Sequence, residues 1–195
     1  MKKSLTVICL LAIISFRSYG QIDVPLIELS SLGFTGEDST KNFIVLNAPD
    51  YSKEQLFKIV HSYLNTVYKN PKAALSTSEG ESIVVNGFTN SIKGGLDWYE
   101  YPMEYKIIYQ FKDGKIKFEP SITSLEEIWS ENKPARKIYV RNTDSPNDVE
   151  INCIYMKAKD TPYYFLFKED LKNSIDRWIK YEVTTLVEAI KAEDW

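Results

Sequence analysis

The sequence FIVLNAPDYSKEQLFKIVHSYLNTVY, residues 43–68, predicts a buried strand, a turn and a long amphipathic helix. Ser52 and Gln55 have the spacing of a capping box, in which each side chain satisfies a backbone N–H at the helix start. Tyr51 stands where it can pack on Leu56 as a hydrophobic staple. Apolar residues then recur every three or four positions, and these are Leu56, Ile59, Val60, Tyr63, Leu64 and Val67. We therefore expect a helix whose one apolar face is seated on a sheet.

Residues 1–20 have the pattern of a secretory signal peptide. Lys2 and Lys3 form a basic start, residues 5–16 are almost wholly apolar, and Ser18-Tyr19-Gly20 gives a small-x-small cleavage pattern. This apolar run is shorter than the roughly 20 residues that a membrane span needs. No later stretch is long and apolar enough to be a transmembrane segment. The sequence predicts an exported protein, periplasmic or extracellular, either free or peripheral to the outer membrane.

Cleavage after residue 20 leaves about 175 residues, which suits a single domain with its own core. It removes Lys2, Lys3 and Arg17 but no acid, so the net charge falls from −3 to about −6. This acidity argues against a nucleic-acid partner, because a phosphate backbone requires a basic face.

Cys153 is the only cysteine of the predicted mature chain, so no disulfide forms within it. It is either a reactive thiol or a small buried hydrophobe. We expect burial, because Ile151, Cys153 and Tyr155 would share one face of a strand.

The mature chain divides into an N-terminal arm, residues 21–41, and one α+β domain, residues 42–195. The arm is rich in Ser, Gly, Thr and acids, so we expect it to lie on the body without an element of its own. Within the domain, residues 73–89 indicate two strands joined at Glu79-Gly80, followed by a loop that contains Gly94-Gly95.

A hairpin over residues 99–122 is the clearest β signal. Every odd position from Tyr99 to Phe111 is apolar, while the even positions are mostly polar, which predicts one face on a core and one in water. Asp113-Gly114 supplies the tight turn. The buried face continues on the return strand with Ile116, Phe118 and Ile122.

The segment between Ser121 and Lys168 is less regular. Residues 136–140 and 151–156 are expected to be strands, and 163–167 is either a strand or the lead-in to the last helix. That closing helix, about residues 170–192, has Asp170 as its expected N-cap. Its apolar stripe comprises Leu171, Ile175, Trp178, Ile179, Val183, Leu186 and Ile190. The predicted fold is a curved antiparallel sheet with both amphipathic helices on one face.

Reactive residues are sparse, so no catalytic, cofactor-binding or metal-binding residue is assigned. His61, the only histidine, falls at the edge of the helix stripe and is expected to be half in solvent. Two pairs of carboxylates, Glu100 with Glu104 and Glu126 with Glu127, could in principle serve glycoside hydrolysis. Both pairs have the pattern of ordinary solvated positions.

Aromatic content is the richest unexplained feature, with 13 tyrosines. Most fall on the predicted core face, where packing explains them. Trp98, of opposite parity, and Tyr163 and Tyr164 are the candidates for contact with a ligand or partner, provided that they converge on a groove.

The order of these motifs resembles the family called domain of unknown function forty-four sixty-eight. The residues that carry the resemblance are Phe43-Ile44-Val45-Leu46, Tyr51 to Phe57, Ile83 to Phe88 and the Tyr-rich hairpin to Phe118. The resemblance covers residues 43–122 and implies a TBP-like, helix-grip-like fold in an exported protein of Bacteroidetes-type bacteria. It brings no catalytic residue, and a fold does not determine a function.

The sequence thus favours a non-enzymatic envelope domain that binds an envelope protein or glycan through its sheet face or an exposed aromatic patch. A carbohydrate-active hydrolase with paired carboxylates is the alternative. A purely structural subunit, which would expose a large apolar patch, is the third.

Overall fold

The computed structural model describes residues 22–94, 99–128, 134–141, 152–157 and 164–192. Its elements in chain order are β1 (Glu28–Ser30), β2 (Gly33–Thr35), β3 (Ile44–Asn47), α1 (Lys53–Val67), α2 (Pro71–Ala74), β4 (Leu75–Ser78), β5 (Ser82–Thr89), β6 (Lys93–Gly94), β7 (Tyr99–Glu100), β8 (Met103–Lys112), β9 (Lys115–Glu127), β10 (Arg136–Lys137), β11 (Tyr139–Arg141), β12 (Cys153–Lys157), β13 (Tyr164–Leu166) and α3 (Glu169–Ala192). The predicted signal peptide lies outside the described residues.

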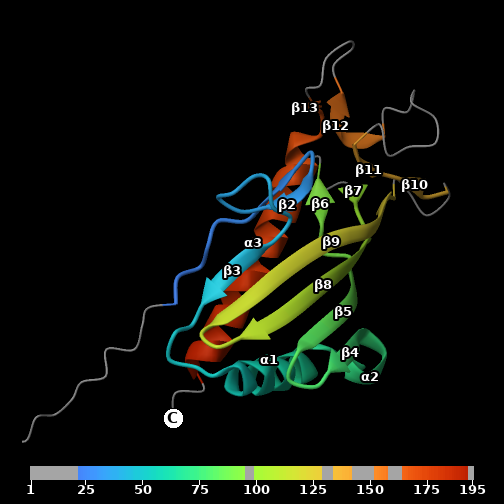
Figure 1. Cartoon of the computed structure of the whole chain (residues 1–195). Coiled ribbons are helices and arrows are strands. Elements are labelled where there is room, and N and C mark those ends of the chain that lie inside the picture. The colour runs from blue at the N-terminus through green and yellow to red at the C-terminus, as the bar shows by residue number, and fades with distance from the viewer. Residues whose placement is uncertain (1–21, 95–98, 129–133, 142–151, 158–163, 193–195) are drawn as a thin grey trace, which may run out of the picture.

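The central sheet has the strand order β3-β9-β8-β5-β4, and every neighbouring pair is antiparallel. β10 pairs with the far end of β9. Figure 1 shows α3 running along the back of this sheet and α1 crossing it at one end. The expected α+β class, with a curved antiparallel sheet and helices packed on it, is confirmed.

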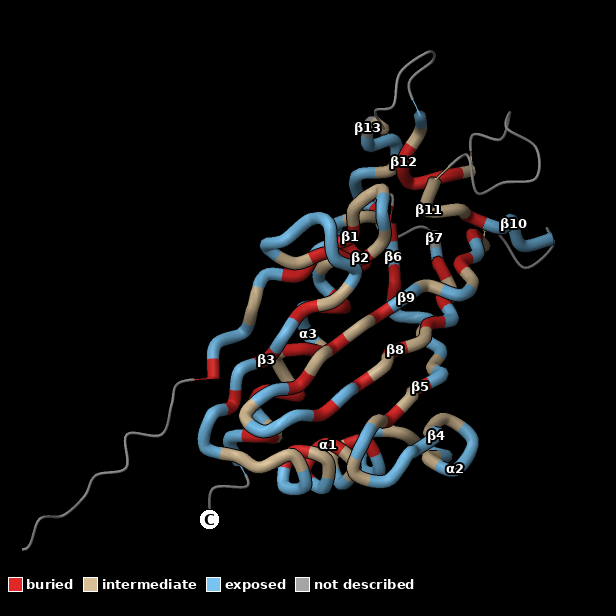
Figure 2. The backbone as a smooth tube through the Cα atoms, in the orientation of Figure 1, coloured by how far each residue is buried: buried red, intermediate tan, exposed pale blue. Residues whose placement is uncertain are grey.

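The alternating hairpin forms as the sequence indicates. The buried residues of odd number are Tyr101, Met103, Tyr105, Ile107, Tyr109 and Phe111. Figure 2 shows the resulting alternation of buried and more exposed positions along β8 and β9. Asp113 and Gly114 connect the two strands, and Gly114 has the positive φ of 68° that this turn needs.

Both helices pack on that odd-numbered face of β8. The ring of Phe57 in α1 meets Phe111 edge-on, with 5.5 Å between centroids. The ring of Trp178 in α3 lies 4.6 Å from that of Tyr105. Phe111 and Tyr105 project from the same side of β8, so α1 and α3 cover one face of the sheet. No helix among the described residues packs on the opposite face, which we call the helix-free face.

Helix α1 has the predicted start, with both hydrogen bonds of the capping box between Ser52 and Gln55. Its stripe is buried at Leu56, Ile59, Val60 and Leu64. Val67, however, is 48% exposed, so its predicted burial is wrong. The helix ends at Val67, and the next residue, Tyr68, turns inward so that its hydroxyl lies 3.0 Å from that of Tyr105.

The C-terminal part also differs in detail from the prediction. α3 starts at Glu169, so Asp170 lies in the first turn instead of capping it, although its charge still suits that end of the helix dipole. The aromatic run before it forms a strand, β13, which pairs with β12. Cys153 is buried as expected, and so are Ile154 and Tyr155, because both faces of β12 are covered.

The N-terminal arm has an element of its own, contrary to the prediction. β1 and β2 form a hairpin in which Leu29 pairs with Phe34, and both side chains are buried. Phe34 packs on Trp178 of α3 at 6.4 Å between ring centroids. Strands of three residues are too short for an alternating pattern to be seen in the sequence, and the contact with α3 is what stabilises them.

Candidate functional site: the free edge of β3

β3 is the first strand of the central sheet, and among the described residues it pairs with β9 on one side and with no strand on the other. The Ala48 N–H donates to the Gly114 carbonyl at 2.8 Å, so residues of even number in this segment direct their backbone toward β9. Backbone direction alternates along an antiparallel strand. The N–H and C=O groups of Val45 and Asn47 therefore point away from the sheet, and neither has a hydrogen bond to another described residue across that edge.

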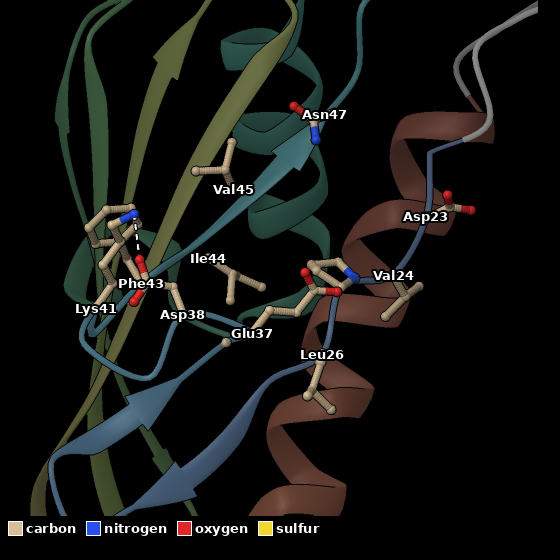
Figure 3. A pocket seen from close by; sticks show the side chains of 12 residues that line it. Asp23, Val24, Leu26, Glu37, Asp38, Lys41, Phe43, Ile44, Val45 and Asn47 are labelled. Atoms are coloured by element: carbon tan, nitrogen blue, oxygen red, sulfur yellow. Dashed lines mark ion pairs between the residues drawn. The ribbon is translucent and has the colours of Figure 1, made fainter.

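A groove of about 530 Å³ runs beside this edge. Figure 3 shows β3 on one side of it and the extended segment that carries Asp23, Val24 and Leu26 on the other. Residues 22–27 belong to no strand, whereas β3 is paired with β9 on its other side. The groove accordingly lies between a strand edge and an extended segment.

One end of the groove is closed by a close approach at Gly36. A Cβ on Gly36 would lie 2.7 Å from Cγ2 of Ile44 and 3.2 Å from the carbonyl oxygen of Leu26. Only glycine lets β3 and the arm come together here. Figure 3 shows Asn47 of β3 and Asp23 of the arm on the two sides of the groove.

Exposed aliphatic side chains gather around the groove. Leu26 is 57% exposed, Val45 39% and Val24 37%. All three line it. Single exposed aliphatic residues are ordinary on a protein surface, whereas a group beside an unpaired strand edge is typical of a contact surface.

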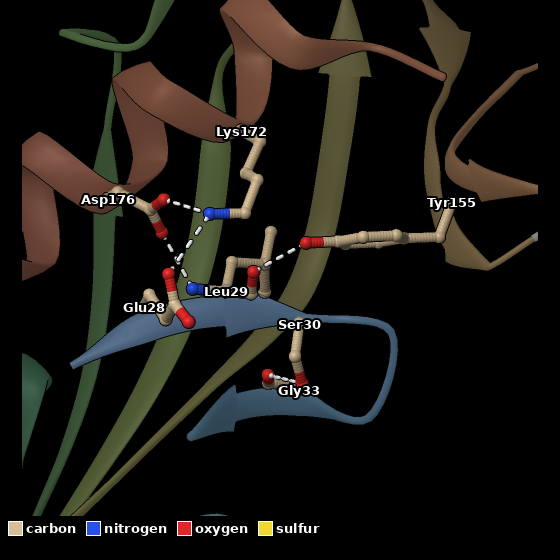
Figure 4. A network of polar contacts seen from close by, with 7 residues as sticks. All are labelled: Glu28, Leu29, Ser30, Gly33, Tyr155, Lys172 and Asp176. Carbon is tan, nitrogen blue, oxygen red and sulfur yellow. Dashed lines mark hydrogen bonds and ion pairs between the residues drawn. The ribbon is translucent and has the colours of Figure 1, made fainter. Parts of the chain in front are cut away.

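The arm that forms the far wall is held by a polar network with α3 and β12, drawn in Figure 4. Asp176 accepts the Leu29 N–H at 2.6 Å and pairs with Lys172 at 2.5 Å. The Tyr155 hydroxyl donates to the Leu29 carbonyl at 2.6 Å, and burial raises the pKa of Tyr155 to about 12. The N–H and the C=O of Leu29 are thus both hydrogen-bonded to side chains and not to a neighbouring strand. These bonds hold the arm, and with it the far wall of the groove, against α3 and β12.

The charged side chains that line the groove are mainly acidic. Asp23, Glu37 and Asp38 line the groove with Lys41, which pairs with Asp38 at 2.7 Å. The Lys41 ammonium and the Thr40 hydroxyl hold the pKa of Asp38 at about 2, well below its usual value. Asp38 is therefore a permanent anion and unsuited to donate a proton.

On the helix-free face of the sheet, a second hollow of about 460 Å³ adjoins the groove. It shares Phe43 and Val45 with the groove. We call it the lysine hollow, because it is lined by Lys112, Lys115 and Lys117, together with Ser82, Gln110 and the two shared residues among others. The free edge of β3 is thus the ridge between two concave surfaces.

The three aromatic candidates from the sequence are not shown to converge here. Trp98 and Tyr163 lie outside the described residues. Tyr164, in β13, is partly buried and packs against the core. The edge position of β3 is not evident in the sequence, because the continuous apolar run Phe43 to Leu46 predicts a buried strand, as a strand in the centre of a sheet would.

The carboxylate pairs differ in burial. Glu100, Glu104 and Glu126 are exposed, as expected. The prediction for Glu127 is wrong: it is 3% exposed. Its carboxylate accepts from the Tyr101 hydroxyl at 2.8 Å and pairs with Lys168 at 3.0 Å.

A register shift explains why Glu127 faces inward. Glu104 of β8 pairs with Ser124, whereas Tyr105 pairs with Ile122, so β9 has one additional residue at this point. Such a bulge exchanges the two faces of the strand beyond it. Leu125 and Glu127 consequently take the core side that Ile116 and Phe118 occupy earlier in β9.

The sheet, its two helices and their order define a TBP-like α+β fold. Among solved structures, the chain is similar to a TBP-like protein from Parabacteroides distasonis, with a TM-score of 0.53 and 12% identity over 76% of this chain and 90% of that chain. It is also similar to a DUF4468 family protein from Bacteroides ovatus, with a TM-score of 0.43 and 11% identity over 91% of this chain and 90% of that chain. The second carries the name of the family that the sequence resembles. No protein-family model and no curated protein matches the chain.

The first of these structures confirms the TBP-like fold, and at such low identity the likeness concerns the fold alone. None of the described helices combines the length with the apolar composition that crossing a bilayer requires.

Proposed function

We propose that the protein is an exported, non-enzymatic binding module of the bacterial envelope that takes up an extended peptide segment of a partner protein. The segment adds to the free edge of β3 as a further strand. Main-chain hydrogen bonds to a sheet edge supply affinity in this mode of recognition, and alternate side chains supply specificity.

The outward backbone of Val45 and Asn47, beside the groove, carries this proposal. An edge strand with unpaired N–H and C=O groups is a template for another chain, and proteins that do not use it usually cover it. Here the aliphatic residues Val24, Leu26 and Val45 line the groove beside the edge and stay exposed among the described residues.

Hydrolysis receives less support from the described carboxylates. A glycosidase needs one protonated carboxyl as its acid, close to a second carboxylate. The Glu127 carboxylate accepts a hydrogen bond from Tyr101 and forms an ion pair with Lys168. The contact with Lys41 keeps Asp38 ionised. Glu100 and Glu104 are exposed on the sheet.

Val45→Pro tests the proposal, because it removes an outward N–H that the fold does not use, and proline is tolerated at a strand edge. The probe is an array of immobilised random heptapeptides. We expect the mature protein to bind a subset, and Val45→Pro to bind it about threefold to tenfold more weakly through the loss of one hydrogen bond and the clash of the ring.

Val45→Thr is the matched control, since it keeps both the N–H and the branched side chain, and circular dichroism checks that each variant is folded. Hydrogen exchange of the Val45 and Asn47 amides should slow when a selected peptide is added. Equal binding by Val45→Pro, or no binding by the wild type, would overturn the proposal.

Export is tested by mass spectrometry of the envelope fraction, where the chain should lack residues 1–20.

A further inference from the structure

The lysine hollow has no function in the fold that accounts for its charge. Lys112 of β8 stands directly opposite Lys115 of β9, and like charges in that position destabilise a sheet. In the next row, Ser82, Gln110, Lys117 and Val45 lie side by side across four strands. Three lysines and one acid, Glu81, therefore line one concave part of a protein whose net charge is −3.

The acids nearest the hollow are already engaged. Asp113 accepts the backbone N–H of Lys53 at 2.9 Å, and Glu81 pairs with the ammonium of the same lysine. Glu119 pairs with Lys117 at 2.6 Å. Neither Lys112 nor Lys115 has an ion pair with another described residue. Two positive charges are thus left for a ligand.

The position of the hollow relates it to the edge of β3. Side chains of an added strand would alternate between the two faces of the sheet. Those on the helix-free face would pass over Val45 toward Lys115 and Lys117, while the others would enter the groove beside Leu26 and Ile44.

We infer that the segment bound at β3 carries Glu or Asp at alternate positions, facing the lysine hollow, with apolar residues between them. This inference rests on the proposed function and specifies its partner. Asp23 and Glu37 line the other side of the site and would repel the same segment shifted by one residue. The two sides of the site therefore select both the register in which the segment binds and the composition of that segment.

The inference is tested with three peptides of equal length. One alternates Val with Glu, the second Val with Gln and the third Val with Lys. Their binding to the full mature chain is measured by fluorescence anisotropy. We expect the Glu peptide to bind most tightly and its advantage over the Gln peptide to shrink with added salt. Lys112→Gln combined with Lys115→Gln should weaken binding of the Glu peptide about threefold to tenfold, since each partly exposed ion pair contributes modestly.

Lys106→Gln is the control, because Lys106 lies on the same face of β8 but outside the hollow. The double variant should unfold at a temperature no lower than the wild type, since it relieves repulsion, so weaker binding cannot be ascribed to a damaged fold. If Glu and Gln peptides bind equally, or the Lys peptide binds best, the acidic preference is wrong while edge binding stands. If none of the three binds, edge binding fails as well.

Discussion

At the scale of single residues, Glu182 of α3 is a carboxyl placed among aromatic side chains. It is partly buried, close to Tyr63, Tyr105 and Tyr109, and Trp178 hydrogen-bonds to it. Burial raises the pKa of Glu182, and the bond from Trp178 only partly offsets this. A carboxyl whose pKa is higher in the folded than in the unfolded chain costs stability once the pH exceeds its unfolded value.

Glu182→Gln should therefore raise the midpoint of thermal unfolding at about pH 7 and have little effect near pH 4, where both states are largely protonated. The amide keeps an acceptor for Trp178. Glu188→Gln, exposed on the same helix, is the control and should change stability little at either pH. Calorimetric melts at the two pH values measure this, and an equal effect of Glu182→Gln at both would show that the titration is not the cause.

At the scale of elements, Gly87 determines how β5 approaches β8. It pairs with Tyr105, and a Cβ on Gly87 would overlap the Tyr105 ring. That ring is held in place, because its hydroxyl lies 3.0 Å from that of Tyr68 and the ring packs against Trp178 at a tilt of 55°. A glycine inside a strand pattern thus marks a side chain that lies across the neighbouring strand.

Gly87→Ala is expected to destabilise the protein by about 1–3 kcal/mol, because the clash must displace a packed ring. Asn86→Ala, next to it and exposed, should change stability by less than about 0.5 kcal/mol. Urea titrations followed by tryptophan fluorescence compare the two. Similar midpoints for both variants would mean that Tyr105 has space to move.

At the scale of the whole molecule, the far wall of the groove depends on contacts that hold the N-terminal arm to α3 and β12. Asp176 and Tyr155 bind the backbone of Leu29 from α3 and β12, elements that are more than 100 residues distant in the chain. The groove wall is therefore a long-range product of the fold. Releasing the arm would remove the wall and leave the β3 edge intact.

Asp176→Ala should destabilise the protein by about 1–3 kcal/mol, because it leaves the Leu29 N–H without its acceptor and weakens the pairing of Lys172. Hydrogen exchange should accelerate in β1 and β2 while β8 stays protected. Asp176→Asn retains an acceptor for the Leu29 N–H, so the amides of β1 and β2 should exchange more slowly in this variant than in Asp176→Ala. Unchanged exchange in β1 and β2 with Asp176→Ala would show that Phe34 and Leu29 hold the arm by packing alone.

Local patterns in the sequence predicted most of the central fold. The capping box at Ser52, the alternation in β8 and the turn at Gly114 depend on neighbours a few residues away, so each can be identified in the sequence. Residue type, and for Trp98 also its parity, makes Trp98, Tyr163 and Tyr164 candidates, and neither property says which side chains share a surface.

What the sequence by itself determined is the class of fold, because periodic burial and helix capping are local properties of the chain. Tertiary structure decided where a site could lie. The apolar run at β3 looks the same in the sequence whether the strand is central or at an edge, and only its pairing with β9 alone makes it an edge. Likewise, one additional residue in β9 turned Glu127 into the core, and strand register placed Lys112 against Lys115. Pairing and register are set by contacts between distant segments, so the helix at residues 53–67 could be predicted from its own residues, whereas the open edge of the strand before it could not.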